Sequence, residues 1–169
     1  MIDQNFDDDI EECKDIENLT LYEARWTKKR YKEYCLKNKV PFFKREYDGK
    51  DVYNERLNIL NNVLYSLCTA IVLMCHLNPS IGFIHGYSRR GGLSFDLADL
   101  IKTKCVFDHT FSARNKEKTM RQLMYSMMST LKENNNKYLK ILIKICLVLG
   151  EEGFTMDKFK DVLYEDYSL

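Results

Sequence analysis

Proline and glycine are scarce in this sequence, which has two prolines and seven glycines among 169 residues. Both residues interrupt helices, so their scarcity favours long helical segments. Few segments alternate apolar and polar residues with a period of two, which is the pattern of a half-buried strand. We therefore expect a mostly α protein with little or no sheet, of a length that suits one domain with a sizeable core.

Metal-binding cysteine pairs, a secretory leader and a long membrane-spanning run are also missing. The six cysteines form no Cys-x-x-Cys pair, so the spacing of a structural zinc site is absent. Several of them lie on apolar helix faces, where thiols pack as small hydrophobic groups. The N-terminus is acidic, and the apolar run 63–77 is shorter than a membrane span requires. We expect a reduced, soluble, cytoplasmic protein with no membrane partner.

Acidic residues are almost absent from 25–45, which holds nine Lys or Arg and the single acid Glu33. Residues 1–17 have the opposite balance, with eight acids and one lysine, and we interpret them as an acidic tail. A basic cluster of this kind suits a phosphate backbone, because binding releases counterions. The alternative is an ordinary solvated helix face.

The expected helices surround one central segment, 52–76. Its later half is apolar nearly all round, as is typical of a helix in the middle of a domain. We expect about five to six helices in one domain, 18–169. The expected helices are 19–38, 52–76, 93–104, 116–133, 138–149 and 155–164. Val40-Pro41 ends the first of them, and the asparagine run 134–136 separates the fourth from the fifth.

Polar chemistry is concentrated in 81–102. A strand-like apolar run, 81–84, leads into His85, and a helix that follows a glycine-flanked loop carries Asp96 and Asp99 on one face. Imidazole and carboxylate together suit a divalent metal; oxygen ligands favour magnesium or manganese, and the nitrogen biases the site toward manganese. The alternative is a core histidine with satisfied hydrogen bonds and an Asp pair that caps or solvates its helix.

A third metal ligand would have to come from elsewhere in the chain, and Glu23 on the basic helix is the candidate. Its alternative role is a capping box with Thr20, three residues earlier. A metal site requires the three side chains to converge within about 5 Å of one point. Arg89 and Arg90 could bind a phosphate that the flanking glycines let approach closely, or they could belong to an ordinary exposed loop.

Two motifs carry a resemblance to a known family. GFIHG with GGLSFDLADLIK, and YEARWTKKRYKEY upstream, resemble the catalytic stretch of CRISPR-associated protein Cas one (Cas1), the spacer-acquisition integrase, and are nearest to its bacterial type I forms. The resemblance runs from about residue 20 to residue 111. The matching residues are Glu23, Arg25 and Tyr31 upstream, and Gly82, Phe83, His85, Phe95, Asp96, Ala98, Asp99 and Lys102 downstream.

The resemblance implies a catalytic site of Glu23, His85 and Asp99 that binds Mn²⁺ or Mg²⁺, with Asp96 supporting it. In the family, such a site joins the 3′ hydroxyl of a prespacer to the CRISPR repeat by transesterification. We expect the DNA-binding residues to be Arg25, Lys28, Lys29, Arg89, Arg90 and Lys102.

The family also has a β-rich N-terminal domain that makes its homodimer, and 1–22 resembles no such domain. The resemblance therefore implies that 18–169 corresponds to the C-terminal helical catalytic domain. Its expected partners are prespacer and repeat DNA, a second copy of the chain and the small protein Cas two. The alternative is a catalytically inactive truncated homologue that acts as a DNA- or partner-binding helical module, or a helical domain without a metal.

Overall fold

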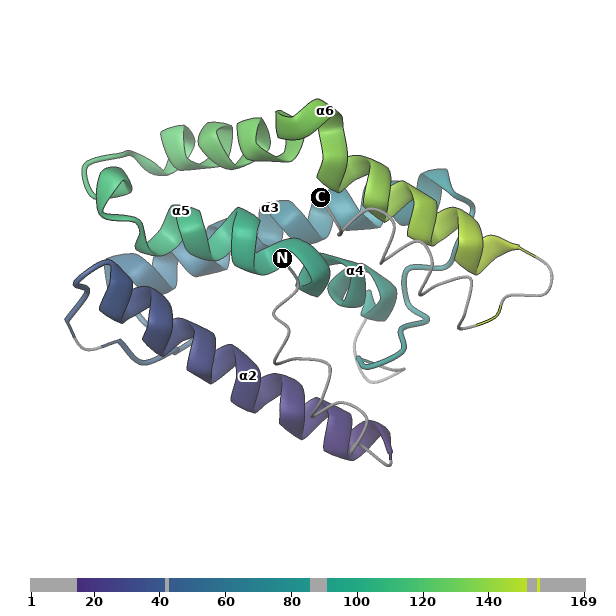
Figure 1. Ribbon diagram of the computed structural model, residues 1–169, viewed down its shortest axis with the longest axis horizontal. Helices are drawn as coiled ribbons and strands as arrows, with labels where there is room; N and C mark the ends of the chain where they lie inside the picture. Colours follow the sequence, from purple (N-terminus) through teal and green to yellow (C-terminus); the bar gives the residue numbers. More distant parts are fainter. Residues whose placement is uncertain (1–14, 42, 86–90, 152–154, 156–169) are drawn as a thin grey trace.

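The computed structural model describes residues 15–41, 43–85, 91–151 and 155. These residues form five α-helices and no strand (Figure 1). The helices are α2 (Ile16–Lys37), α3 (Val52–Met74), α4 (Gly92–Lys102), α5 (Asp108–Phe111) and α6 (Met120–Gly150). A π-helical turn, Thr103–Phe107, joins α4 to α5. The prediction of a mostly α domain is therefore confirmed over the described ranges.

Helix α3 is the centre of the domain, as predicted. It starts at Asp51, whose carboxylate accepts hydrogen bonds from the backbone N–H groups of Tyr53 and Asn54. Nine of its residues are buried, and it packs against α4 and α6. By length and composition alone α3 could also cross a membrane, so the shortness of 63–77 does not decide that question. Its packing is that of a core helix.

Helix α2 begins before the predicted position and takes in the last two residues of the predicted acidic tail. Its N-cap is Asp15, whose Oδ1 accepts from the backbone N–H of Asn18 at 2.7 Å. The hydroxyl of Thr20 instead donates to the carbonyl oxygen of Ile16. The predicted capping box of Thr20 with Glu23 is therefore wrong, because a better cap lies five residues earlier.

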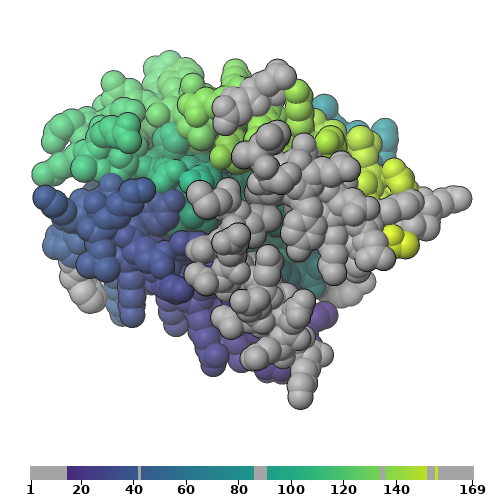
Figure 2. All heavy atoms as spheres, in the orientation of Figure 1, coloured from purple at the N-terminus to yellow at the C-terminus, as the bar shows by residue number. Residues whose placement is uncertain are grey.

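Aromatic rings attach α2 to the rest of the domain. The ring of Tyr31 lies 4.8 Å from that of Phe107 and 6.0 Å from that of Phe111, and Tyr34 contacts the same two rings. In the space-filling view α2 forms the lower side of the visible face, and α6 lies along its upper side (Figure 2). This packing leaves one face of α2 to solvent.

Helix α6 is a single element of 31 residues, where the sequence predicts two helices and a linker. The asparagine run lies inside it, and Asn136 has a positive φ of 61°, which asparagine tolerates better than most residues. Figure 1 shows a change of direction along α6. The predicted link at 134–136 is therefore wrong. The predicted helix 155–164 lies outside the described residues, apart from its first residue.

Candidate functional site

The carboxylate of Asp96 on α4 is the centre of the site. It accepts hydrogen bonds from the backbone N–H groups of Phe83, Ile84 and His85. It also lies 2.7 Å from Nδ1 of the His85 ring. The backbone of this segment therefore bonds to a side chain on α4, where the sequence predicts a strand. The strand prediction for 81–84 is wrong for that reason.

Gly82 allows the segment to approach α4 this closely. A Cβ atom at this position would lie 2.5 Å from the carbonyl carbon of Gly92 and 2.9 Å from Oδ2 of Asp96. Both distances are shorter than van der Waals contact, and the first is to backbone that cannot move aside easily. Gly91 caps α4 with a φ of 93°, a left-handed conformation that favours glycine. Gly82 and Gly91 thus allow the segment that carries His85 to pack closely against the start of α4.

His85 is oriented toward Asp99. Because Nδ1 faces Asp96, the other ring nitrogen, Nε2, lies 3.9 Å from Oδ2 of Asp99. The hydrogen bond to Asp96 raises the pKa of His85 against the opposing effect of burial, and the negative charges of Asp99 and Glu23 add to the increase. Burial alone would raise the pKa of Asp96, but its bonds to His85 and to the backbone N–H groups outweigh burial and lower it. The pair therefore favours a charged imidazolium beside a carboxylate.

Lys102 forms an ion pair with the other carboxylate oxygen of Asp99, Oδ1. Its Nζ lies 2.7 Å from Oδ1 of Asp99, and it sits 5.5 Å from the ring centre of Tyr65 on α3. Burial disfavours the ammonium, yet Asp99 and Tyr65 outweigh burial and raise the pKa of Lys102. Its side chain is only 17% exposed. Lys102, predicted to bind DNA, therefore lies within the site beside Asp99.

Glu23 lies on α2, apart from the other predicted ligands. It is half-buried and accepts a hydrogen bond of 3.1 Å from the hydroxyl of Thr27. Its charge contributes to raising the pKa of His85, so the two side chains interact. Among the described residues no three His, Cys, Asp or Glu lie close enough together to hold a metal ion. The structure thus groups His85 with the two aspartates and leaves Glu23 on the neighbouring helix.

The predicted DNA-binding residues are divided between surface and site. Arg25, Lys28 and Lys29 are exposed on α2. Arg89 and Arg90 lie outside the described residues.

Two aromatic side chains that were not predicted as site residues also line the site, although Phe95 belongs to the motif that carries the family resemblance. The ring of Phe95 on α4 lies 5.7 Å from that of His85 and 4.6 Å from that of Tyr65. Because Phe95 is next to Asp96 in the sequence, its presence in the site could have been predicted. Nothing in the sequence indicates that Tyr65 belongs to the site, because Tyr65 reaches it only through the packing of α3 on α4.

Comparison with known proteins gives consistent matches. The family model described as CRISPR associated protein Cas1 matches residues 3–139. CRISPR-associated endonuclease Cas1 1 of Rhodospirillum rubrum is 31% identical over 117 residues, which cover 66% of this chain and 37% of the relative. CRISPR-associated endonuclease Cas1 of Pectobacterium atrosepticum is 32% identical over 108 residues, which cover 62% and 32%. CRISPR-associated endonuclease Cas1 3 of Methanospirillum hungatei is 27% identical over 140 residues, which cover 79% and 46%. The matches thus span about a third to a half of the length of these curated relatives.

Proposed function

This chain belongs to the CRISPR associated protein Cas1 family, and on that premise we propose that it acts in CRISPR adaptation as a metal-dependent DNA endonuclease and integrase. It would join the 3′ hydroxyl of a prespacer to the repeat by transesterification in the cytoplasm. Its relatives are named endonucleases, which supports a nuclease-type enzyme. The structural observation that carries the proposal is the direction of His85 Nε2 toward Asp99, with Nδ1 held by Asp96.

The metal would be held by His85 and Asp99. Glu23, the third ligand that the family resemblance implies, lies on α2 and would have to approach them when the ion binds, because no three such side chains among the described residues lie close enough together. Two ligand atoms that are each about 2.1 Å from one ion lie at most about 4.2 Å apart, and the 3.9 Å between Nε2 and Oδ2 is within this limit. Nitrogen with carboxylate oxygen is a donor set for Mn²⁺ or Mg²⁺. When bound, such an ion lowers the pKa of an attacking hydroxyl and neutralises charge that develops on the phosphate.

The side chains around these ligands would orient them and attract the substrate. Asp96 is a positioning residue, because its bond to Nδ1 fixes which ring nitrogen is directed at Asp99. Lys102 places a positive charge beside Asp99, where it would attract a DNA phosphate.

The substrate and partners are proposed on the same premise. The exposed Arg25, Lys28 and Lys29 would bind the backbone of prespacer and repeat DNA outside the site. A second copy of the chain and Cas two remain its proposed protein partners.

A strand-transfer assay with a half-site DNA substrate and Mn²⁺ tests this function. His85→Ala and Asp99→Ala should abolish product, and Asp96→Asn should lower the rate by about 10- to 100-fold, as loss of a partner that orients a metal ligand usually does. His76→Asn is the matched control, because His76 is exposed and its positive φ of 58° suits asparagine. Product formation that survives in both ligand variants would contradict the proposal.

A second function, a catalytically inactive DNA- or partner-binding module, is favoured by the bond between Lys102 and Asp99. A carboxylate already paired with a buried ammonium is less ready to bind a metal. In this case the unmodified chain should bind duplex DNA with an affinity that falls steeply with salt, yet yield no strand-transfer product. A flat salt response would exclude Arg25, Lys28 and Lys29 from the DNA-binding surface.

A further inference from the structure

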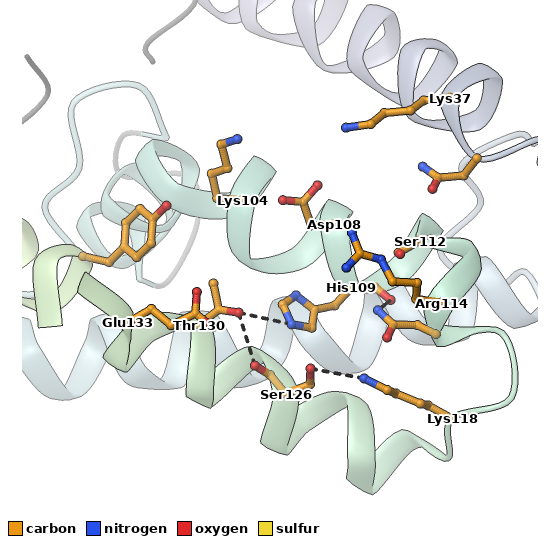
Figure 3. Close-up of a pocket in the computed structure, with 13 residues that line it drawn as sticks. Lys37, Lys104, Asp108, His109, Ser112, Arg114, Lys118, Ser126, Thr130 and Glu133 are labelled. Atoms are coloured by element: carbon orange, nitrogen blue, oxygen red, sulfur yellow. Dashed lines mark hydrogen bonds between the residues drawn. The ribbon is translucent and has the colours of Figure 1, made fainter. Parts of the chain in front are cut away.

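A second polar pocket lies apart from the His85 site (Figure 3). It is lined by the end of α2, the π-helical turn with α5, the segment 112–118 and residues of α6 between 126 and 138. Its volume is about 470 Å³, which is within the range of pockets that bind small molecules. It shares no lining residue with the His85 site, so it calls for a separate explanation.

Positive charge gathers around this pocket. Four cationic side chains line it, from Lys37, Lys104, Arg114 and Lys118, against two acids, Asp108 and Glu133. Four positive and two negative charges leave a net charge of +2, without counting histidine. Within the described ranges none of the four cations forms an ion pair with an acid. Such a concentration of cations attracts an anion.

His109 is a buried polar group without a complete set of partners. The residue is only 7% exposed, and it lines the pocket. Its Nδ1 meets no partner at full hydrogen-bond geometry within the described part of the chain, although the backbone of Cys105 and of Ser126 lies close enough to oppose the lowering of its pKa by burial, and its Nε2 has a long contact of 3.4 Å with the hydroxyl of Thr130. Buried polar atoms are nearly always hydrogen-bonded. His109 therefore adds a weakly hydrogen-bonded imidazole to the lining of a basic pocket.

The pocket also contains hydroxyl groups, and part of its lining is held in place by hydrogen bonds from Arg56. The hydroxyls of Ser126 and Thr130 lie beside His109, and the ammonium of Lys118 reaches Ser126 at 3.4 Å (Figure 3). The guanidinium of Arg56, itself 5% exposed, donates to the carbonyl oxygens of Asn115 at 3.1 Å and Lys116 at 3.0 Å. These bonds hold the segment that carries two of the pocket's four cations, Arg114 and Lys118, so less freedom is lost when a ligand binds.

We propose that this pocket binds the phosphomonoester group of a nucleotide-sized small molecule. A phosphomonoester is close to a dianion at neutral pH and offers three acceptor oxygens, which matches the net charge of +2 and the four cationic side chains of the pocket. The volume admits a mononucleotide and is too small for a duplex. The inference uses no residue of the His85 site, so it stands or falls independently of the proposed function.

Histidine ring NMR on the full chain tests the inference, with 5′-AMP, inorganic phosphate, adenosine and an unphosphorylated DNA duplex as probes. The sequence has three histidines, His76, His85 and His109, so each ring signal reports on one region. AMP and phosphate should each shift the His109 signal saturably, and AMP should bind more tightly. Adenosine and the duplex should leave it unchanged.

Charge reversal in the pocket supplies the matched comparison. Arg114→Glu with Lys118→Glu should weaken AMP binding by about tenfold or more, because charge-assisted bonds are lost and like charges meet. Both residues lie at the pocket's rim, and Lys50→Glu, at an exposed position outside the pocket, should leave the affinity unchanged. The inference is overturned if AMP produces no saturable shift at His109, if the reversal has no effect, or if adenosine or the duplex gives the same shift.

Discussion

His85 and His109 are the same residue type in opposite electrostatic surroundings. His85 touches the carboxylate of Asp96 and faces that of Asp99, and its pKa is raised. His109 lines a pocket with a cationic excess, and burial lowers its pKa. Both rings are substantially buried, so burial alone does not explain why their pKa values move in opposite directions. At His85 the carboxylates outweigh burial, whereas at His109 burial outweighs the backbone bonds and the charge of Asp108. The first site is lined by carboxylates that suit a cation, and the second by ammonium and guanidinium groups that suit an anion.

Removing Asp96 should produce the largest effect, because three backbone N–H groups and the His85 ring lose their common acceptor. Asp96→Ala should lower the free energy of unfolding by about 3 kcal/mol, since bonds to a charged group are worth about 1.5–3 kcal/mol each and water replaces some of them. The pKa of His85 should fall, because burial is then less opposed. Urea unfolding and NMR titration measure the two effects.

Asp108→Ala is the control for that experiment, since Asp108 lies beside His109 in the other region. It should leave the titration of His85 unchanged. A His85 pKa that does not move in Asp96→Ala would break the comparison between the two histidines.

Replacing Arg56 should have the next largest effect. Its buried guanidinium bonds to the carbonyl oxygens of Thr110, Asn115 and Lys116 without an acidic partner among the described residues. Arg56→Met should lower the free energy of unfolding by about 2 kcal/mol, because buried acceptors are left unsatisfied. The variant should also change the His109 ring signal and leave that of His85 in place, since the rim of the pocket depends on Arg56.

Arg121→Met is the matched control for Arg56, because Arg121 is exposed over the ring of Tyr125. Its effect on unfolding should stay within about 0.5 kcal/mol, as is usual for surface positions. Equal losses in the two variants would show that the carbonyl bonds of Arg56 contribute nothing specific.

The smallest effect should be a pH dependence with opposite signs at the two histidines. The pKa of His109 is lower in the folded chain than in the unfolded one, so His109 contributes stability above about pH 6.5 that is lost as pH falls toward the folded pKa. Asp108, Glu133, Lys37, Lys104, Arg114 and Lys118 face the same pocket. His109→Gln should therefore flatten the loss of stability between pH 7.5 and pH 5.5, measured as the urea midpoint.

His85→Gln should change that slope in the other direction. The pKa of His85 is raised by folding, so its contribution is fully present below about pH 6.5 and is lost as pH rises through the folded pKa. Slopes that change in the same direction in the two variants would contradict the assignment of opposite environments.

The sequence predicts the parts of this molecule that depend on local patterns. The apolar later half of α3 identifies the central helix, and the spacing of His85, Asp96 and Asp99 brings them together within one short stretch. The bond from Lys102 to Asp99 also has a local signal, since residues three apart on a helix are neighbours. From the sequence we nevertheless assign Lys102 to DNA binding and do not predict its bond to Asp99.

Features that depend on tertiary packing were missed or misread. The segment 81–84 has the composition of a strand, but backbone N–H groups of this segment and of His85 donate hydrogen bonds to the carboxylate of Asp96 on α4. Asn136 interrupts the regular conformation of α6 with its positive φ, but the helix resumes after it and does not end at the asparagine run as predicted. The His109 pocket is assembled from α2, α5 and α6, and no spacing within one element indicates it. The metal ligands Glu23, His85 and Asp99 stay a prediction.

Manganese binding tests the His85 site most directly, through paramagnetic broadening of the three histidine ring signals. Substoichiometric Mn²⁺ should broaden the signal of His85 and leave those of His109 and His76 sharp. Asp99→Asn should abolish the broadening, whereas Asp108→Asn should not change it. Uniform broadening of all three signals, or selective broadening of His85 that persists in Asp99→Asn, would contradict a metal site shared by His85 and Asp99.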